Sequence, residues 1–147
     1  MRCTTFFSPP QDFRPTVHAA GCYCEYQQQI LFVKRHPEKS QGNTWGVPGG
    51  KLEAGETAAI AVMREVYEEV GIQIASSSLH PIGILYKRLP HLDFTFHLFR
   101  SRFECCPPIT LAIEENIEAK WVSIEEARQL PLIAGGEEAL NFYASGL

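Results

Sequence analysis

Three glutamates between Thr57 and Val70 are the residues whose types and spacing most clearly suggest chemistry. Glu65, Glu68 and Glu69 stand at positions i, i+3 and i+4, so on a helix they share one patch of surface. Like charges at these spacings repel one another and destabilise an isolated helix. Hard divalent cations such as Mg²⁺ take carboxylate oxygens as ligands, often together with substrate phosphates. The pattern therefore predicts a metal site on a helix, and a solvated glutamate-rich face is the alternative.

The segment before this helix favours a site that binds metal and phosphate over a plain solvent-exposed acidic face. Pro48, Gly49 and Gly50 predict an abrupt turn whose backbone groups are not shielded by side chains. Lys51 adds a positive charge that suits a phosphate. The segment is not a Walker-type loop, because Leu52 stands where a metal-binding Ser or Thr would follow the lysine. We therefore expect Gly49, Gly50 and Lys51 to bind substrate.

Loop and helix together match a known motif at every fixed position. The matching residues are Gly50-x5-Glu56-x7-Arg64-Glu65-Val66-x-Glu68-Glu69-x-Gly71-Ile72. This is the pattern of the Nudix box, and the chain resembles MutT-like Nudix hydrolases over nearly its whole length. The resemblance implies an α/β fold, the Nudix α/β/α sandwich with a central mixed sheet. It also implies hydrolysis of a nucleoside diphosphate linked to another moiety, with Mg²⁺ or Mn²⁺ as the cofactor.

The resemblance also implies a role for the glutamates of the box. Glu65, Glu68 and Glu69 would be metal ligands, joined by a backbone carbonyl of Gly49 or Gly50. With the metal bound, a site that is acidic when empty would attract a polyanionic nucleotide.

The other box residues and a later acidic loop would complete the catalytic set. By the resemblance, Arg64 would orient the glutamates, and Glu56 would brace the loop or contact the metal through water. The general base in related enzymes is a box glutamate or a glutamate on a later loop. Here Glu115 or Glu118 is favoured as an extra ligand or base, and a solvated acidic loop is the alternative.

Basic and aromatic residues outside the box are candidates for contacts with the nucleotide. Lys34 and Arg35 resemble the basic position that contacts the nucleotide in MutT-type members, although a plain surface pair fits them equally. Nucleotide bases stack on aromatic side chains. The candidates for stacking are Tyr86, Phe94, Phe96 and Phe99. Alternating aromatic residues on a strand are also typical of a core.

Substrate class is predicted from what lies downstream of the box. The markers of ADP-ribose and dinucleoside polyphosphate hydrolases are misplaced, since Pro90 and Tyr86 do not fall at the expected positions. The chain is most similar to a compact MutT-like nucleoside triphosphate pyrophosphohydrolase, which releases a nucleoside monophosphate and pyrophosphate. An ADP-ribose or nucleotide-sugar pyrophosphatase is the main alternative. A non-catalytic nucleotide-binding module and an isomerase on the same fold are alternatives from other classes.

Hydrophobic periodicity indicates the helix that must position the glutamates. The spacing of apolar residues predicts this helix over Thr57–Val70, and Gly71 is expected to end it as a left-handed C-terminal cap. Its apolar arc, expected to pack against a sheet, comprises Ala59, Ile60, Val62, Met63, Val66, Tyr67 and Val70. The small Ala58 and Ala61 would lie on the glutamate side and leave room for a ligand.

The rest of the chain predicts strands and two shorter helices around this helix. The expected strands are Thr16–Tyr26, Ile30–Val33, Trp45–Val47, Pro81–Arg88, Phe94–Phe103 and Ala119–Val122. Ser123 and Glu126 predict a capping box for a helix that Pro131 ends, and Gly136–Ser145 predicts a last helix. Residues 1–15 show no periodicity and predict an irregular lead-in. This order predicts one mixed sheet covered by helices.

Composition limits the class of protein. The chain has 147 residues, which suits a single domain over 1–147. Its 13 Lys and Arg against 17 Asp and Glu give a net charge of −4, which argues against binding DNA or RNA polymers. No apolar run approaches the roughly 20 residues that cross a bilayer, and the N-terminus lacks the apolar segment of a signal peptide. We therefore expect no membrane association and a cytoplasmic protein.

Five cysteines do not match the pattern of a disulfide-linked secreted domain. Cys22 with Cys24, and Cys105 with Cys106, could form a four-thiolate zinc site, but neither pair has the usual spacing. Reduced thiols are the expectation. The expected partner is a nucleotide, and the sequence does not select between a monomer and a homodimer.

Overall fold

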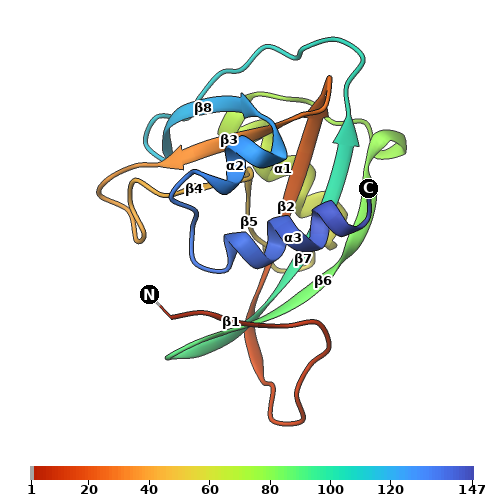
Figure 1. Ribbon diagram of the computed structural model, residues 1–147. Helices are drawn as coiled ribbons and strands as arrows, with labels where there is room; N and C mark the ends of the chain where they lie inside the picture. Colours follow the sequence, from red (N-terminus) through yellow and green to blue (C-terminus); the bar gives the residue numbers. More distant parts are fainter. Residues whose placement is uncertain (1) are drawn as a thin grey trace.

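The computed structural model describes residues 2–147, which form a mixed sheet with helices on both sides (Figure 1). The strands are β1 (Thr4–Phe6), β2 (Pro15–Tyr26), β3 (Gln29–Arg35), β4 (Trp45–Gly46), β5 (Gly49–Lys51), β6 (His80–Leu89), β7 (Leu92–Arg102) and β8 (Asn116–Val122). The helices are α1 (Ala58–Val70), the 3₁₀ turn η1 (Ser76–Ser78), α2 (Ile124–Arg128) and α3 (Gly136–Ser145). The expected α/β class with a mixed sheet is confirmed.

The long strand β2 organises the sheet. Its neighbours in the order β1-β6-β7-β2-β3-β4 include β7, which pairs with it in parallel, and β3, which pairs with it antiparallel. The short β5 also pairs with β2, and β8 pairs with β3. β5 therefore attaches the segment before α1 to the middle of the sheet.

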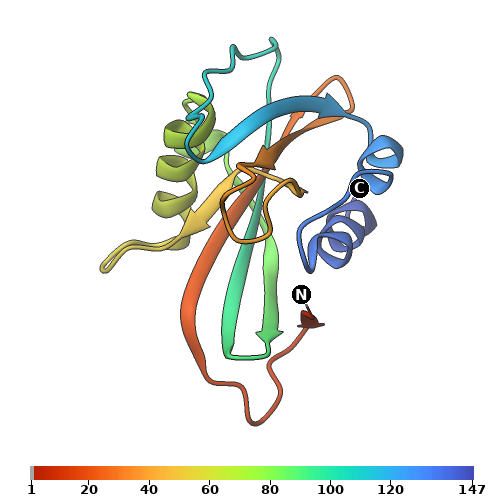
Figure 2. The same ribbon diagram turned by 90° about the vertical axis from the view of Figure 1, so that its left-hand side faces the viewer.

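Two hydrophobic cores lie on opposite faces of the sheet. Figure 2 shows α1 on one side of the strands and α2 with α3 on the other. One core packs Val62, Val66 and Val70 of α1 against the sheet, and the other packs Leu140 and Tyr143 of α3 against it. This arrangement is the α/β/α sandwich that the resemblance implied.

Helix α1 has the caps that the sequence predicts. The Thr57 hydroxyl accepts a hydrogen bond from the Ile60 N–H at 3.2 Å. Gly71 has a φ of 74° and its N–H donates to the Tyr67 carbonyl at 2.9 Å. Because a left-handed residue without a side chain ends the helix without steric cost, α1 stops at Val70.

The predicted buried face of α1 is wrong by roughly a quarter turn. Ile60 and Tyr67, expected in the core, are 52% and 57% exposed, whereas Ala61, expected beside the ligand, is fully buried. The buried stripe runs instead through Ala61, Val62, Val66, Glu69 and Val70. The helix is turned toward Glu69, so that one charged residue of the box faces the sheet.

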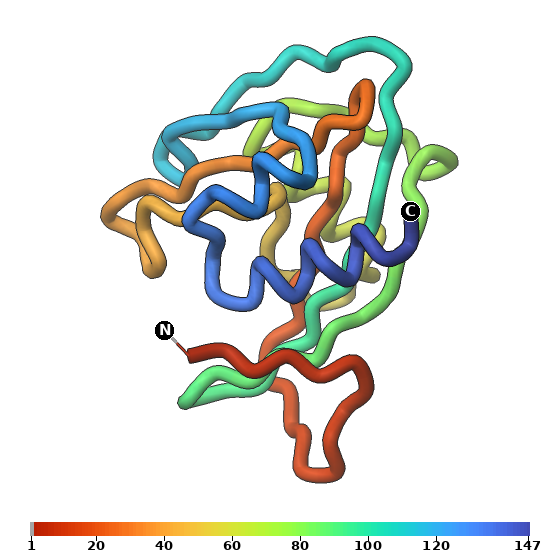
Figure 3. The backbone as a smooth tube through the Cα atoms, in the orientation of Figure 1, coloured from red at the N-terminus to blue at the C-terminus, as the bar shows by residue number. Residues whose placement is uncertain are grey.

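The N-terminal segment is more ordered than the predicted lead-in. Residues Thr4–Phe6 form β1, which pairs antiparallel with β6 and places Thr5 opposite Lys87. The path of this segment along the edge of the sheet is visible in Figure 3. Three residues are too few to give a periodic pattern, so the sequence alone carried no signal for this strand.

Other local predictions are confirmed or corrected in detail. The capping box of Ser123 and Glu126 is present, and α3 has the predicted bounds. Gly49–Gly50, expected as a turn, belong to β5. Cys22 and Cys24 are buried and Cys105 and Cys106 are exposed, all as free thiols.

None of the helices formed by residues 2–147 has the length and apolar character needed to cross a lipid bilayer.

Candidate active site

Glu69 is the buried carboxylate at the centre of the candidate site. Only 9% of the surface of Glu69 is exposed. One oxygen, Oε1, accepts a hydrogen bond from Asn116 Nδ2 at 2.9 Å, and Oε2 accepts one from the Gly49 N–H at 3.3 Å. Burial raises the pKa of Glu69 to about 8, and the nearby Glu65 carboxylate adds to the rise, while the two donated hydrogen bonds oppose it. Two carboxyl groups crowded together in a buried place repel each other when both are ionised, so a cation bound between them would be stabilising.

Arg64 ties the remaining acidic residues together. Its Nε and Nη2 donate to the two oxygens of Glu56 at 2.7 and 2.8 Å. Its Nη1 donates to Glu65 Oε1 at 2.9 Å and to Glu68 Oε2 at 3.2 Å. Hydrogen bonds from Arg64 lower the pKa of Glu56 to about 2. This is the geometry expected of a residue that orients the box.

The glycines before α1 allow backbone and carboxylate to touch. A Cβ on Gly50 would lie 2.4 Å from Glu65 Cδ, and one on Gly49 would lie 2.2 Å from the Ala20 carbonyl oxygen. Any side chain at either place would collide with its neighbour. Arg64 Nη2 also donates to the backbone carbonyl of Lys51 at 3.2 Å, so the loop is fastened to the helix.

The acidic groups fit a divalent cation that is shared with a phosphate. Among residues 2–147, no three carboxylate, imidazole or thiolate groups already converge on one point. Glu68 is held by Arg64 and is 56% exposed, while Glu65 and Glu69 lie close together beside the glycines. Mg²⁺ is commonly bound by one or two carboxylates, with water and substrate phosphates completing its octahedron. Glu65 and Glu69 could hold such a cation as a partial ligand set, which Glu68 could join by a change of rotamer.

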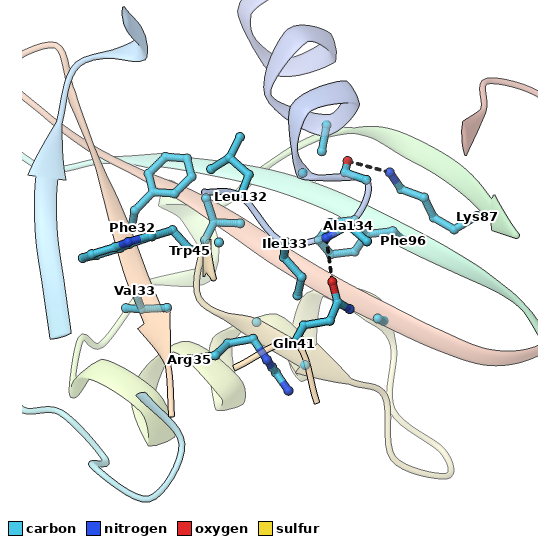
Figure 4. A pocket seen from close by; sticks show the side chains of 18 of the residues that line it. Phe32, Val33, Arg35, Gln41, Trp45, Lys87, Phe96, Leu132, Ile133 and Ala134 are labelled. Atoms are coloured by element: carbon cyan, nitrogen blue, oxygen red, sulfur yellow. Dashed lines mark hydrogen bonds between the residues drawn. The ribbon is translucent and has the colours of Figure 1, made fainter. Parts of the chain in front are cut away.

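A pocket of about 230 Å³ has Glu69 in its wall and extends to Gly135 and Gly136 at the start of α3. Figure 4 shows the labelled side chains that surround it. Apolar and aromatic side chains make up most of its wall, including Trp45, Phe94, Phe96, Leu132 and Ile133. The polar side chains in the lining are Arg35, Gln41, Glu69, Lys87 and Asn116. An apolar pocket with a few convergent polar groups is typical of a small-molecule site.

The predicted substrate contacts are partly brought together here. Arg35, Gly49 and Gly50 line the pocket, whereas Lys51 is exposed and does not line it. Of the aromatic candidates for stacking, Phe94 and Phe96 line the pocket. Phe99 lies in the core on the α1 side, and Tyr86 packs edge-on against Phe13.

The side chains of Glu115 and Glu118 pair with lysines in this geometry and not with the glutamates of the box. Glu115 Oε1 lies 3.0 Å from Lys39 Nζ, and Glu118 Oε2 lies 3.7 Å from Lys120 Nζ. Neither residue lines the pocket, and among residues 2–147 the ion pairs of these two carboxylates are those with Lys39 and Lys120. In this geometry the two residues that were favoured as an extra ligand or base are paired with lysines.

Sequence reasoning missed three polar residues of the site. Asn116, Gln41 and Lys87 belong to no motif, yet Asn116 binds Glu69 and Gln41 Oε1 accepts a hydrogen bond from the Ala134 N–H at 2.7 Å. A signal for Lys87 existed in the strand alternation, because Lys87 has the same parity as the buried Leu85. Asn116 carried no comparable signal.

Comparison with known proteins agrees with this geometry. The NUDIX domain family model matches residues 14–143. The phosphatase NudJ of Escherichia coli O1:K1 is 32% identical over 143 residues, which cover 91% of this chain and 86% of that protein. The 8-oxo-dGTP diphosphatase of Proteus vulgaris is 38% identical over 61 residues, and this match spans 42% of the chain and only about half (54%) of that enzyme.

A solved structure shows the same fold at lower identity. It is a bifunctional NMN adenylyltransferase/ADP ribose pyrophosphatase from Francisella tularensis, complexed with AMP and a Mn ion. The TM-score is 0.74 at 22% identity, and the superposed part covers 92% of this chain and 43% of that one. Because the family model matches most of the chain, which carries the complete box on an α/β/α sandwich, the chain belongs to the NUDIX family of hydrolases, enzymes that act on phosphoric anhydride bonds.

Proposed function

We propose that this chain is a Mg²⁺- or Mn²⁺-dependent pyrophosphohydrolase that cleaves nucleoside triphosphates into a nucleoside monophosphate and pyrophosphate. The observation that carries the proposal is the position of Glu69, whose buried carboxylate lies between the box helix and an aromatic-walled pocket. A diphosphate held beside Glu69 would have its nucleoside in this pocket. The proposed metal ligands are Glu65, Glu68 and Glu69, with a backbone carbonyl of Gly49 or Gly50.

The chemistry requires the carboxylates to keep fixed orientations. A divalent cation bound here would neutralise charge on the phosphate oxygens and lower the pKa of a bound water. Asn116 and the Gly49 N–H hold Glu69, and Arg64 holds Glu65. A residue kept in place by neighbours needs little reorganisation when charge develops on the phosphate.

Activation of the attacking water is assigned to the box. Glu115 and Glu118 pair with lysines and not with the glutamates of the box, so we place the proton acceptor among the box glutamates. Glu56, held by Arg64, braces the loop that carries the glycines.

Two substrate classes remain in competition. The pocket side chain Arg35 and the exposed Lys51 supply positive charge toward a polyphosphate. One relative is named for a nucleoside triphosphate substrate, 8-oxo-dGTP, which favours the triphosphate. The structural neighbour complexed with AMP and Mn, an ADP ribose pyrophosphatase, favours ADP-ribose or a nucleotide sugar as the second candidate.

Product analysis separates these candidates. Purified protein is incubated with Mg²⁺ and a panel of nucleoside triphosphates, ADP-ribose and nucleotide sugars, and the products are identified by chromatography. Pyrophosphate and a monophosphate from a triphosphate support the proposal. Turnover of ADP-ribose alone, to AMP and ribose phosphate, would select the second candidate.

Charge-neutral variants test the ligands. Glu68→Gln and Glu69→Gln are expected to lower kcat on the order of 100-fold, because each removes a negative charge from the metal site. Glu125→Gln is the matched control, since Glu125 is an exposed glutamate on α2, in the opposite layer. Full activity in both box variants would reject the ligand assignment.

A further inference from the structure

A buried ammonium group lies in the pocket wall, away from the box. Lys87, on β6, is 1% exposed. Its Nζ donates to Thr5 Oγ1 of β1 at 2.8 Å and to the Gly135 carbonyl, before α3, at 2.9 Å. Figure 4 shows the side chain extending beside Phe96 toward the loop that carries Ala134.

In the part of the chain that the structure describes, the Lys87 ammonium has fewer hydrogen-bond acceptors around it than N–H groups, and it has no ion pair in direct contact. Both acceptors are neutral oxygens, and among residues 2–147 no carboxylate oxygen lies within ion-pair distance of Lys87 Nζ. An ammonium has three N–H groups and no acceptor, so one donor is left over. Burial lowers the pKa of Lys87, and the nearby Cys3 thiol and Glu138 carboxylate oppose this shift. A buried charge without an ion pair in direct contact is costly, and Lys87 lines the cavity where a ligand could supply a contacting partner.

Strand register places Lys87 at the far end of the pocket from the carboxylates. Gly49 pairs with Gly21 of β2, while Lys87 pairs with Phe94 of β7, which pairs with Val17 of β2. Three strand spacings and four residues therefore separate Gly49 from Lys87, roughly 14 Å across the sheet and 13 Å along it. A ligand whose phosphates lie at the box would meet Lys87 with its opposite end, the base.

We propose that Lys87 is a specificity-determining residue that selects nucleotides whose base carries a keto oxygen, at C6 of a purine or C4 of a pyrimidine, over those that carry an amino group there. This rests on the proposed function, because it names the base that the same pocket takes. A keto oxygen accepts the third N–H of Lys87, whereas an amino group presents a second donor to a group that can only donate. Phe94 and Phe96 in the same wall give a base its stacking surface.

Inosine and adenosine nucleotides form the discriminating pair, since they differ only at the N1–C6 edge of the purine. We expect kcat/KM with ITP to exceed that with ATP by at least about 10-fold, the order of one hydrogen bond to a charged group. In Lys87→Met, which keeps the length but removes every donor, this ratio is expected to fall to within about 3-fold of unity, mainly through a higher KM for ITP. In Lys87→Gln, whose amide can also accept, it is expected to shift further toward ATP.

Lys39→Met is the matched control, because Lys39 is a lysine outside the pocket that pairs with Glu115. Its ITP-to-ATP ratio is expected to equal that of the unchanged chain. Thermal melting of each variant verifies folding, and Lys87→Gln carries the test if Lys87→Met does not fold. If both Lys87 variants leave the ITP-to-ATP ratio unchanged, the inference is overturned. Lys87 would then either only tie β1 to the sheet or bind an anionic group that both nucleotides share.

Binding measurements separate this inference from the proposed function. If no nucleotide is cleaved, the proposed function fails, and calorimetric titration with IMP and AMP still tests the pocket. Preference for IMP in the unchanged chain, lost in Lys87→Met, supports the role of Lys87. Equal affinity for the two monophosphates in the unchanged chain would reject it.

Discussion

The hydrogen bond from Asn116 to Glu69 gives the sharpest test of how the site is held. Asn116 is 4% exposed and Glu69 is 9% exposed, and the bond is 2.9 Å long. A hydrogen bond to a charged group contributes about 1.5–3 kcal/mol. Asn116→Ala is therefore expected to lower the free energy of unfolding by about 2 kcal/mol, or roughly 4–8 °C in Tm for a chain of this size.

The assay is urea unfolding in metal-free buffer, within a double-mutant cycle. Because the pKa of Glu69 is about 8, the measurements are made at pH 9, where most Glu69 side chains are ionised. Asn116→Ala is compared in the unchanged chain and in Glu69→Ala, where the carboxylate is gone. We expect its cost to fall below about 1 kcal/mol in the second background, since the charged partner is missing.

Two results would refute this reasoning. An equal cost of Asn116→Ala in both backgrounds would mean that the loss arises from packing and not from the bond to Glu69. A cost below about 0.5 kcal/mol in the unchanged chain would mean that the bond does not stabilise the fold. Asn141→Ala, at a position of α3 where the side chain accepts only a solvent-exposed hydrogen bond from Arg128, is the control and is expected to change stability by less than about 0.5 kcal/mol.

Two further predictions concern the loop before α1. Because Arg64 lowers the pKa of Glu56 to about 2 from an ordinary 4.5, ionised Glu56 stabilises the fold above about pH 4.5, and this contribution is lost as the pH falls toward 2. Tm is therefore expected to drop more steeply between pH 4.5 and 2 in the unchanged chain than in Glu56→Gln, and parallel curves would contradict the assignment. Gly50→Ala is expected to reduce activity at least about 10-fold, because its Cβ would lie 2.4 Å from Glu65 Cδ. Gly55→Ala is the control for Gly50→Ala, because no atom lies within 4 Å of its Cβ although its φ is +83°. It is expected to lower Tm but to leave the folded protein active, and activity assays at low temperature would verify this.

The parts of the molecule that could be predicted from sequence are those set by local chemistry. A glycine cap at Gly71 and the Ser123–Glu126 capping box depend on residues within one or two turns, and both are present. The contact of Arg64 with Glu68 follows equally from the i,i+4 spacing on one helix.

What could not be predicted depends on contacts between distant segments. The hydrophobic pattern of α1 could not reveal that the helix turns Glu69 toward the sheet, because the groups that bind this carboxylate, Asn116 on β8 and Gly49 on β5, are far away in the sequence. Lys87 and Thr5 are 82 residues apart and meet only through the register of β1 on β6. Long-range pairing of this kind leaves no periodic trace in the sequence.

The short strand β1 has a consequence for how the domain is bounded. The family match begins at residue 14, which invites trimming of the preceding segment. Such trimming would uncover the β6 backbone from Tyr86 to Arg88, and a bare hydrogen-bonding edge recruits strands from other molecules. Shortened forms are therefore expected to self-associate or precipitate for a reason unrelated to catalysis. Soluble, monodisperse preparations are expected to depend on keeping β1.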